Sequence, residues 1–272
     1  MNVPETDKVF AGSIPENYDR HMVPLIFEPF AADLAGRAAA LSPISVLETA
    51  AGTGVLTRAL APELSDHASY TVTDLNQPMI DFAATRQPVD HRILWRPADA
   101  LSLPFEDASF DLVCCQFGVM FFPDRIVGFR EAKRVLRPGG HFLFNVWDRI
   151  EENTFANDVT NVLAEAFPND PPRFLARTPH GYHDPDLIRS ELLQSGFASA
   201  AIETRAEQSR ASSAHVPAVA YCHGTLLRNE IEARDTGGLD AATEHVAQAI
   251  AARHGAGEVV AKIQAHVVVA AV

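Results

Sequence analysis

A glycine-rich turn near the start of the chain has residue types suited to binding a small polar ligand. The sequence reads Glu-Thr-Ala-Ala-Gly-Thr-Gly from Glu48 to Gly54. Glycine lets the backbone pass close to a ligand, and the free NH groups of a helix that begins directly afterwards can bind a carboxylate. A tight turn between a strand and a helix would use the same residues without a ligand. The turn therefore indicates a binding site only together with further signals.

Two acidic residues supply such signals. Asp74 ends the second predicted strand, and its distance from Gly52 is close to the separation of about 20 residues expected for an acid that binds ribose hydroxyls. The alternative is that Asp74 caps the helix that begins near Pro78. Asp99 follows the third predicted strand, where it is either a ligand-binding carboxylate or a solvated loop residue. Position and spacing together favour the ribose role for Asp74.

The elements that must position these residues alternate along the chain. Short apolar runs predict strands at 44–47, 70–73, 93–95, 110–115 and 141–146, and helical spacing predicts helices at 54–60, 78–85 and 124–136. Weaker strand signals follow at 201–204 and 263–271. This alternation predicts an α/β fold with a doubly wound, seven-stranded, mostly parallel sheet and helices on both faces. The ligand site of such a sheet lies at the carboxyl ends of its strands.

Five motifs in this order resemble a known family. They occupy 46–60, 74–79, 99–105, 110–113 and 135–140. Together they resemble the class I S-adenosylmethionine-dependent methyltransferases, particularly the branch that includes ubiquinone and menaquinone biosynthesis methyltransferases. The resemblance implies that S-adenosylmethionine is the cofactor and that the chain moves its methyl group onto a small, partly apolar molecule.

The resemblance also implies a set of cofactor-binding residues. It assigns the methionine end to Glu48, Ala50, Gly52 and Gly54, the ribose to Asp74, the flanks of the adenine to Leu75 and Met79, the adenine amino group to Asp99 and Ala100, the sulfonium to Gln116, and a covering role to Tyr18. Ala50 departs from the pattern, since a glycine is common at this position. Its methyl group is accommodated easily only where φ is negative.

Aromatic residues beside the same sheet edge are the candidates for acceptor binding. Phe117 and Phe121 follow the fourth strand and Trp147 follows the fifth. They could hold a flat acceptor and exclude water, or they could only pack the sheet against the next helix. A general base is optional for methyl transfer, and we assign no catalytic residue among the histidines of the flanking segments, which are His21, His180, His183 and His223.

We predict four segments along the chain. Residues 1–41 form an N-terminal helical lid, in which Pro24 and Pro29 interrupt the helix. Residues 42–148 form the cofactor-binding α/β core. Residues 149–183 are a lid or insertion, and residues 184–272 complete the sheet and contain a helical insertion, with Asp184 as the cap of its first helix.

Composition narrows the partners of this chain. A formal net charge of -13 over 272 residues, without a long run of Lys or Arg, argues against nucleic acid and against stable membrane association. We interpret the sequence as that of a cytoplasmic protein. Three cysteines without clustered histidines predict no metal site.

Two other functions share part of this pattern. A nicotinamide-dependent dehydrogenase would have a third glycine in the turn, where this chain has Thr57. A module that binds the cofactor without turnover would have the same sequence features, and only an assay of methyl transfer separates it from an enzyme.

Overall fold

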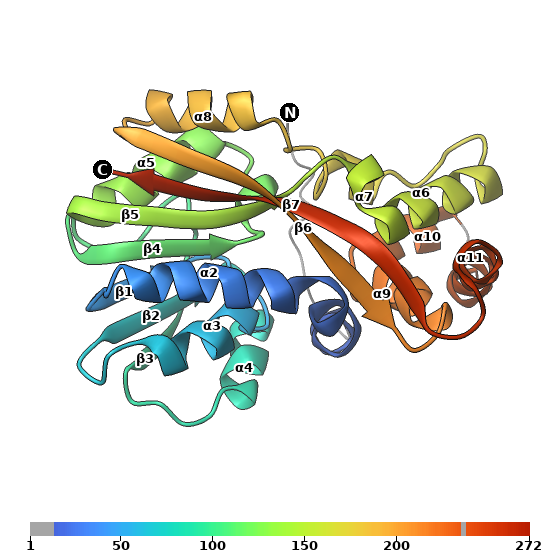
Figure 1. Cartoon of the computed structure of the whole chain (residues 1–272), viewed down its shortest axis with the longest axis horizontal. Coiled ribbons are helices and arrows are strands. Elements are labelled where there is room, and N and C mark those ends of the chain that lie inside the picture. Colours follow the sequence, from blue (N-terminus) through green and yellow to red (C-terminus); the bar gives the residue numbers. More distant parts are fainter. Residues whose placement is uncertain (1–13, 235–237) are drawn as a thin grey trace.

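The computed structural model describes residues 14–234 and 238–272, and a seven-stranded sheet is its central element. The strand order is β3-β2-β1-β4-β5-β7-β6, with β7 antiparallel to both of its neighbours and the other pairs parallel (Figure 1). The strands are β1 (Ser45–Glu48), β2 (Ser69–Asp74), β3 (Ile93–Pro97), β4 (Phe110–Gln116), β5 (Leu136–Trp147), β6 (Ser199–Ala211) and β7 (Val259–Ala271). The predicted fold class is confirmed.

Helices cover both faces of the sheet, so its central strands are apolar on both sides. On one face, side chains of α2 (Glu28–Ala40) and α3 (Val55–Leu60) pack with those of β1, β2 and β4. On the other face, α5 (Arg125–Val135) and α8 (Pro185–Gln194) contact each other and the strands β5 and β6 respectively. The remaining core helix, α4 (Gln77–Arg86), follows β2. Asp184 caps α8 as predicted, since its carboxylate accepts the backbone NH groups of Asp186 and Leu187.

The turns after the parallel strands meet at one edge of the sheet. The backbone NH of Thr49 donates to the carbonyl of Cys114 at 2.9 Å, which fixes the end of β1 beside β4. Gln116 at the end of β4 lies opposite Asn145 of β5. The residues that follow these strands are therefore neighbours in space, as a doubly wound sheet requires.

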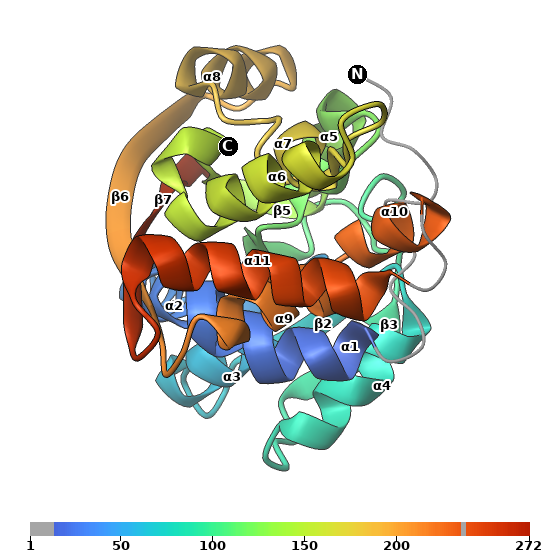
Figure 2. The same ribbon diagram turned by 90° about the vertical axis from the view of Figure 1, so that its right-hand side faces the viewer.

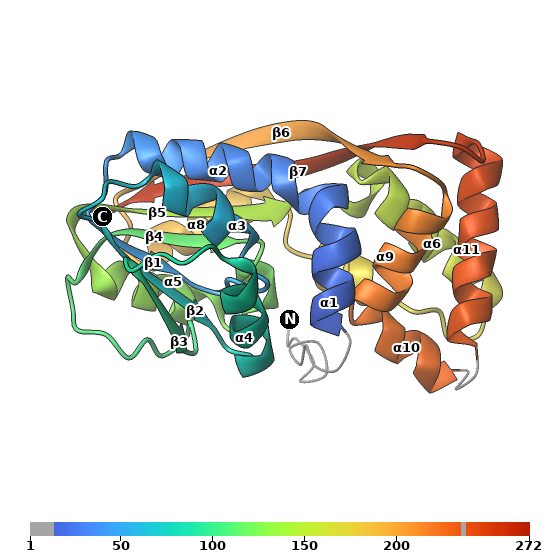
Figure 3. The same ribbon diagram turned by 90° about the horizontal axis from the view of Figure 1, so that it is seen from below.

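Strands β6 and β7 are longer than their sequence signals. β5 pairs with β7 only from Ala265 onward, whereas β6 pairs with β7 from Val259. The extra length extends past the end of β5 as a two-stranded ribbon (Figure 3). The sequence signal missed most of β6 because many of its side chains are polar and exposed, including Glu203 and Gln208.

This ribbon leads into a layer of helices that faces the carboxyl edge of the sheet. The layer contains α6 (Thr154–Ala166), α7 (Phe174–Arg177), α9 (His215–Gly224), α10 (Leu227–Arg234) and α11 (Leu239–His254). Helix α11 packs on α6 and α9, and α1 (Ile14–Asn17) lies against α9 (Figure 2). Among the residues that the structure describes, no helix combines the length and the apolar character needed to cross a membrane.

The N-terminal segment stays helical across both of its prolines. Pro24 lies within a π-helix, η2 (Tyr18–Phe27), and Pro29 lies in the first turn of α2, where a missing NH breaks no hydrogen bond. The expected interruption is therefore a change of helical register. Of the predicted lid 1–41, residues 1–13 lie outside the described residues.

Candidate functional site

A cavity of about 210 Å³ lies between the carboxyl edge of the sheet and the helical layer. One water needs about 10–15 Å³ on this measure, so the cavity has room for a much larger ligand. We call one part of it the loop half, which is lined by Ala50, Gly52, Thr53, Asp74, Leu75, Met79, Asp99 and Ala100. We call the other part the aromatic half, which is lined by Met22, Phe117, Met120, Phe121, Trp147, Phe174, His180 and Tyr221.

Most of the predicted site residues line this cavity. They are Tyr18, Ala50, Gly52, Asp74, Leu75, Met79, Asp99, Ala100, Gln116, Phe117, Phe121 and Trp147. Glu48 and Gly54 belong to the same turn but do not line the cavity. The fold therefore brings together most of the residues that the sequence motifs predicted for the site.

Asp74 organises the loop half. One oxygen of its carboxylate accepts the backbone NH of Gly52 at 2.9 Å, and the other accepts the NH of Asn76 at 2.8 Å. Burial raises the pKa of Asp74, and the hydrogen bonds from Asn76 and Gly52 oppose that shift. The N-cap of α4 is Asn76, so the alternative role of Asp74 as the helix cap is wrong. Asp74 instead links the turn after β2 to the glycine turn, beside the cavity.

Ala50 has a φ of +52°, although the methyl group of an alanine is accommodated easily only where φ is negative. Space for its methyl group comes from Gly118, since a Cβ atom at position 118 would lie 2.5 Å from the Cβ of Ala50. Phe117, the neighbour of Gly118, also has a positive φ of +51°. Left-handed backbone at residues other than glycine costs about 1–3 kcal/mol and concentrates at functional sites. Both strained residues line the cavity.

Glu48 lies behind the glycine turn, fully buried. Its carboxylate accepts hydrogen bonds from the hydroxyl groups of Thr57, at 2.7 Å, and Tyr70. Its other oxygen has no hydrogen-bond partner within the described part of the chain. Burial raises the pKa of Glu48 to about 7, although both hydroxyl groups act in the opposite direction. Glu48 thus connects the start of α3 to β2 beneath the turn.

An ion-pair network holds the N-terminal helix over the glycine turn, and sequence reasoning missed it. The buried carboxylate of Asp19 lies 2.8 Å from Arg58 of α3 and 3.2 Å from Arg86 of α4. Arg58 also donates to the carbonyl of Thr53 at 2.5 Å. No motif signalled these contacts, because the partners lie far apart in the sequence. They keep Tyr18, the next residue to Asp19, on the wall of the cavity.

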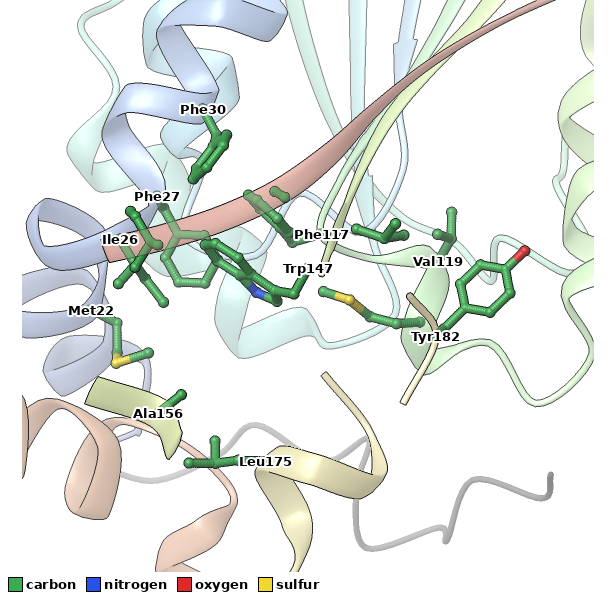
Figure 4. Packing of buried hydrophobic residues seen from close by; sticks show 14 of the residues in the cluster. Met22, Ile26, Phe27, Phe30, Phe117, Val119, Trp147, Ala156, Leu175 and Tyr182 are labelled. Atoms are coloured by element: carbon green, nitrogen blue, oxygen red, sulfur yellow. The ribbon is translucent and has the colours of Figure 1, made fainter. Parts of the chain in front are cut away.

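The predicted acceptor residues form an aromatic cluster. The rings of Phe117 and Trp147 stack with centroids 4.0 Å apart and an interplanar angle of 13°. Phe27 and Phe30 pack against both rings from the N-terminal helices (Figure 4). Only 5% of Phe117 and 3% of Trp147 is exposed, yet both line the cavity together with the half-buried Phe121. Packing and site formation are therefore combined in these rings.

Gln116 lies at the end of β4 and lines the same cavity. Its side-chain NH₂ donates to the carbonyl of Phe27 at 3.2 Å, whereas its Oε1 is buried and has no partner in the described structure. The amide is therefore fixed in the wall of the cavity, with its oxygen buried there. Among the four histidines considered from the sequence, only His180 lines the cavity. Met22, Phe174 and Tyr221 also line it, and no motif singled them out.

Comparison with known proteins agrees with the resemblance seen in the motifs. Residues 47–144 match the methyltransferase domain family. The chain is 39% identical to a demethylmenaquinone methyltransferase of Lactiplantibacillus plantarum over 36% of this chain and 43% of that protein. It is 30% identical to a ubiquinone/menaquinone biosynthesis C-methyltransferase of Paraburkholderia phytofirmans over 56% of this chain and 66% of that protein. These matches span less than two thirds of either relative.

A solved structure shows a similar fold over most of the chain. The crystal structure of a candidate methyltransferase from Bacillus halodurans superposes with a TM-score of 0.56 and 19% identity, covering 89% of this chain and 97% of that one. At this identity the likeness concerns the fold alone. The sequence match identifies residues 47–144 as a methyltransferase domain, in agreement with the family that the motifs resemble.

Proposed function

We propose that this chain transfers a methyl group from S-adenosylmethionine to a small, partly apolar molecule. The observation that carries the proposal is the single cavity in which a polar loop half adjoins an aromatic half. S-adenosylmethionine supplies an electrophilic methyl group on a positively charged sulfur. The protein then has to align the acceptor with that group and keep water away.

The loop half fits this cofactor. Gly52 has a φ of +56°, and a Cβ atom at this position would meet no atom within 4 Å, so a ligand can approach the backbone directly. We assign the ribose hydroxyls to Asp74, whose carboxylate lines the cavity. We assign the faces of the adenine to Leu75 and Met79, and its amino group to Asp99 and Ala100, which extend the same wall.

The junction between the two halves fits a positively charged sulfur. The free Oε1 of Gln116 is a partial negative charge there, and Tyr18 covers the cavity from the N-terminal helix. Glu48 and Gly54 do not line the cavity. We therefore propose that they serve the methionine end of the cofactor indirectly, by fixing the backbone of the glycine turn.

The aromatic half supports a flat, apolar acceptor. Phe117, Phe121 and Trp147 give it aromatic surfaces, and Met22 and Met120 add flexible apolar ones. The relatives named above act in ubiquinone and menaquinone biosynthesis, according to their names. A ring of comparable shape and polarity is the acceptor class that we propose here.

We further propose a division of labour along the chain. Residues 42–148 form the cofactor-binding core, and 184–272 complete its sheet. The segments 14–41 and 149–183 cover the cavity, since Met22 and Phe174 reach it from these two segments.

Ligand-dependent stability tests the proposal. S-adenosylhomocysteine at about 100 times its dissociation constant should stabilise the protein by about 2.7 kcal/mol. Asp74→Asn should lower the affinity about 10- to 150-fold, because hydrogen bonds to a charged group are worth about 1.5–3 kcal/mol. Asp81→Asn is the matched control, since Asp81 is exposed on α4 and does not line the cavity. Equal affinity in both variants would contradict the ribose role of Asp74.

Transfer of a labelled methyl group from S-adenosylmethionine to molecules of a metabolite extract tests turnover. Binding of the cofactor without methyl transfer to any molecule of the extract would favour the alternative of a binding module. Stabilisation by NAD and not by S-adenosylhomocysteine would overturn the proposal.

A further inference from the structure

His180 is a buried polar group in the aromatic half of the cavity. It lies between α7 and α8, only 6% exposed, with its ring centroid 6.0 Å from that of Trp147. Buried polar atoms in an apolar pocket are the groups that orient a ligand. The two ring nitrogens of His180 are the atoms that can bind such a ligand.

The hydrogen bonds of His180 decide this. Its Nδ1 lies 2.8 Å from the backbone carbonyl oxygen of Asp148. A carbonyl can only accept, so Nδ1 carries the hydrogen, and in the neutral ring Nε2 is then an acceptor. Nε2 makes no hydrogen bond to any residue that the structure describes. A residue that lines the cavity thus has one fixed nitrogen and one free acceptor nitrogen.

The surroundings keep the ring neutral. Burial lowers the pKa of His180 to about 4, and the charge of the neighbouring His183 acts in the same direction. The carbonyl of Asp148 and the carboxylates of Asp148 and Glu151 oppose this shift without reversing it. Nε2 therefore remains an acceptor throughout the neutral pH range.

Tyr221 is the other polar side chain that helps to define this subsite. It enters the same cavity from α9, is 2% exposed, and its hydroxyl has no hydrogen-bond partner in the described residues. A hydroxyl both donates and accepts, so Tyr221 does not by itself select for donors. His180 does, because its free nitrogen can only accept.

We propose that Nε2 of His180 accepts a hydrogen bond from a hydroxyl group of the methyl acceptor, which makes a hydroxylated aromatic molecule the preferred acceptor class. That the bound molecule receives a methyl group rests on the proposed function, whereas the hydrogen-bonding subsite rests on the geometry alone. Trp147 and Phe117 contact the ring of such a molecule, while His180 fixes the position of its hydroxyl.

Two matched probes test the subsite. 4-Methylphenol carries a hydroxyl group that stays protonated at neutral pH, and 4-methylanisole has a methoxy group in its place and cannot donate. We expect the wild-type protein to prefer the phenol over the ether, and His180→Phe to reduce that preference about tenfold, the usual worth of one hydrogen bond. Tyr221→Phe is the control, because it removes the other polar atom and keeps His180. An unchanged preference in His180→Phe, or its loss in Tyr221→Phe alone, would overturn the inference.

A spectroscopic measurement reports on the nitrogen directly. In protein labelled with ¹⁵N-histidine, the Nε2 signal of His180 should be that of an unprotonated nitrogen at neutral pH, and the phenol should shift it while the ether does not. A hydrogen on Nε2, or no response to the phenol at millimolar concentration, would contradict the proposal.

Both measurements are made with and without S-adenosylhomocysteine. A phenol preference without any binding of S-adenosylhomocysteine would support the subsite and contradict methyl transfer. Binding of S-adenosylhomocysteine without a phenol preference would have the opposite meaning.

Discussion

Gly118 is the position at which one added methyl group should disturb the site most directly. A Cβ atom there would lie 2.5 Å from the Cβ of Ala50 and 2.6 Å from the Sγ of Cys115. Both distances are shorter than real contacts, and overpacking of this kind costs about 1–3 kcal/mol. For a chain of this size we expect Gly118→Ala to lower the melting temperature by about 2–10 °C. It should also weaken binding of S-adenosylhomocysteine, because Ala50 has to move.

A double-mutant cycle separates the contact with Ala50 from other effects. Ala50→Gly removes one of the two clashing atoms, so Ala50→Gly/Gly118→Ala should recover about 0.5–2 kcal/mol relative to the sum of the single changes. The recovery stays partial because Cys115 remains. Ala50→Gly alone should change stability little, since relief of the left-handed strain offsets the greater freedom of glycine in the unfolded chain.

Gly36→Ala is the matched control for the same substitution. Gly36 lies inside α2, and a Cβ atom there would meet no atom within 4 Å. Alanine in a helix interior is about 0.5–1 kcal/mol more favourable than glycine. Urea unfolding followed by circular dichroism measures all four variants. The reasoning fails if Gly118→Ala is as stable as the wild type, or equally destabilised with alanine and with glycine at position 50.

Three more changes test the electrostatics of the site. Because the pKa of Glu48 is raised to about 7, the stability of the wild type relative to Glu48→Gln should fall by about 3 kcal/mol as pH rises from 4.5 through 7, measured by urea titrations at several pH values. Because the pKa of His180 is lowered to about 4, the stability of the wild type relative to His180→Phe should fall by about 3 kcal/mol as pH falls from 6.5 through 4, which is the opposite direction to the effect of Glu48. Arg58→Met should lower the free energy of unfolding by about 1–3 kcal/mol, which is less than for a fully broken buried pair because Arg86 still faces Asp19. It should also speed hydrogen exchange in η2. Unchanged exchange would show that Arg58 does not hold the N-terminal helix.

The loop half of the site was predictable because it is built from local strand–turn–helix units. An apolar run, a glycine turn and a helix follow one another within a few residues, and a parallel sheet then collects the turns at one edge. Asp74 illustrates this, since its predicted place at the end of β2 put it beside Gly52, to which it is hydrogen-bonded. Ala50 is the exception, because the space for its methyl group comes from Gly118, a residue that is distant in sequence.

The aromatic half was not predictable as a whole because its walls come from segments that share no local pattern. Phe117 and Trp147 follow strands and were identified, whereas Met22, Phe174 and Tyr221 come from helices whose mutual placement depends on the ribbon of β6 and β7. The sequence showed only a short part of β6, because a strand with exposed polar side chains gives a weak apolar signal.

The two halves of the cavity are carried by different parts of the chain. The loop half is formed by the turns after β1, β2 and β3, while half of the residues of the aromatic half lie outside the core of residues 42–148, namely Met22, Phe174, His180 and Tyr221. Changes in α7, α9 or the segment that holds His180 can therefore alter the acceptor without moving the glycine turn. The N-terminal helix is the exception, because Asp19 ties it to Arg58 and Arg86 on the cofactor side while Met22, one turn further on, faces the acceptor side. A substitution in η2 should consequently affect cofactor and acceptor together, whereas one in α9 should affect the acceptor alone.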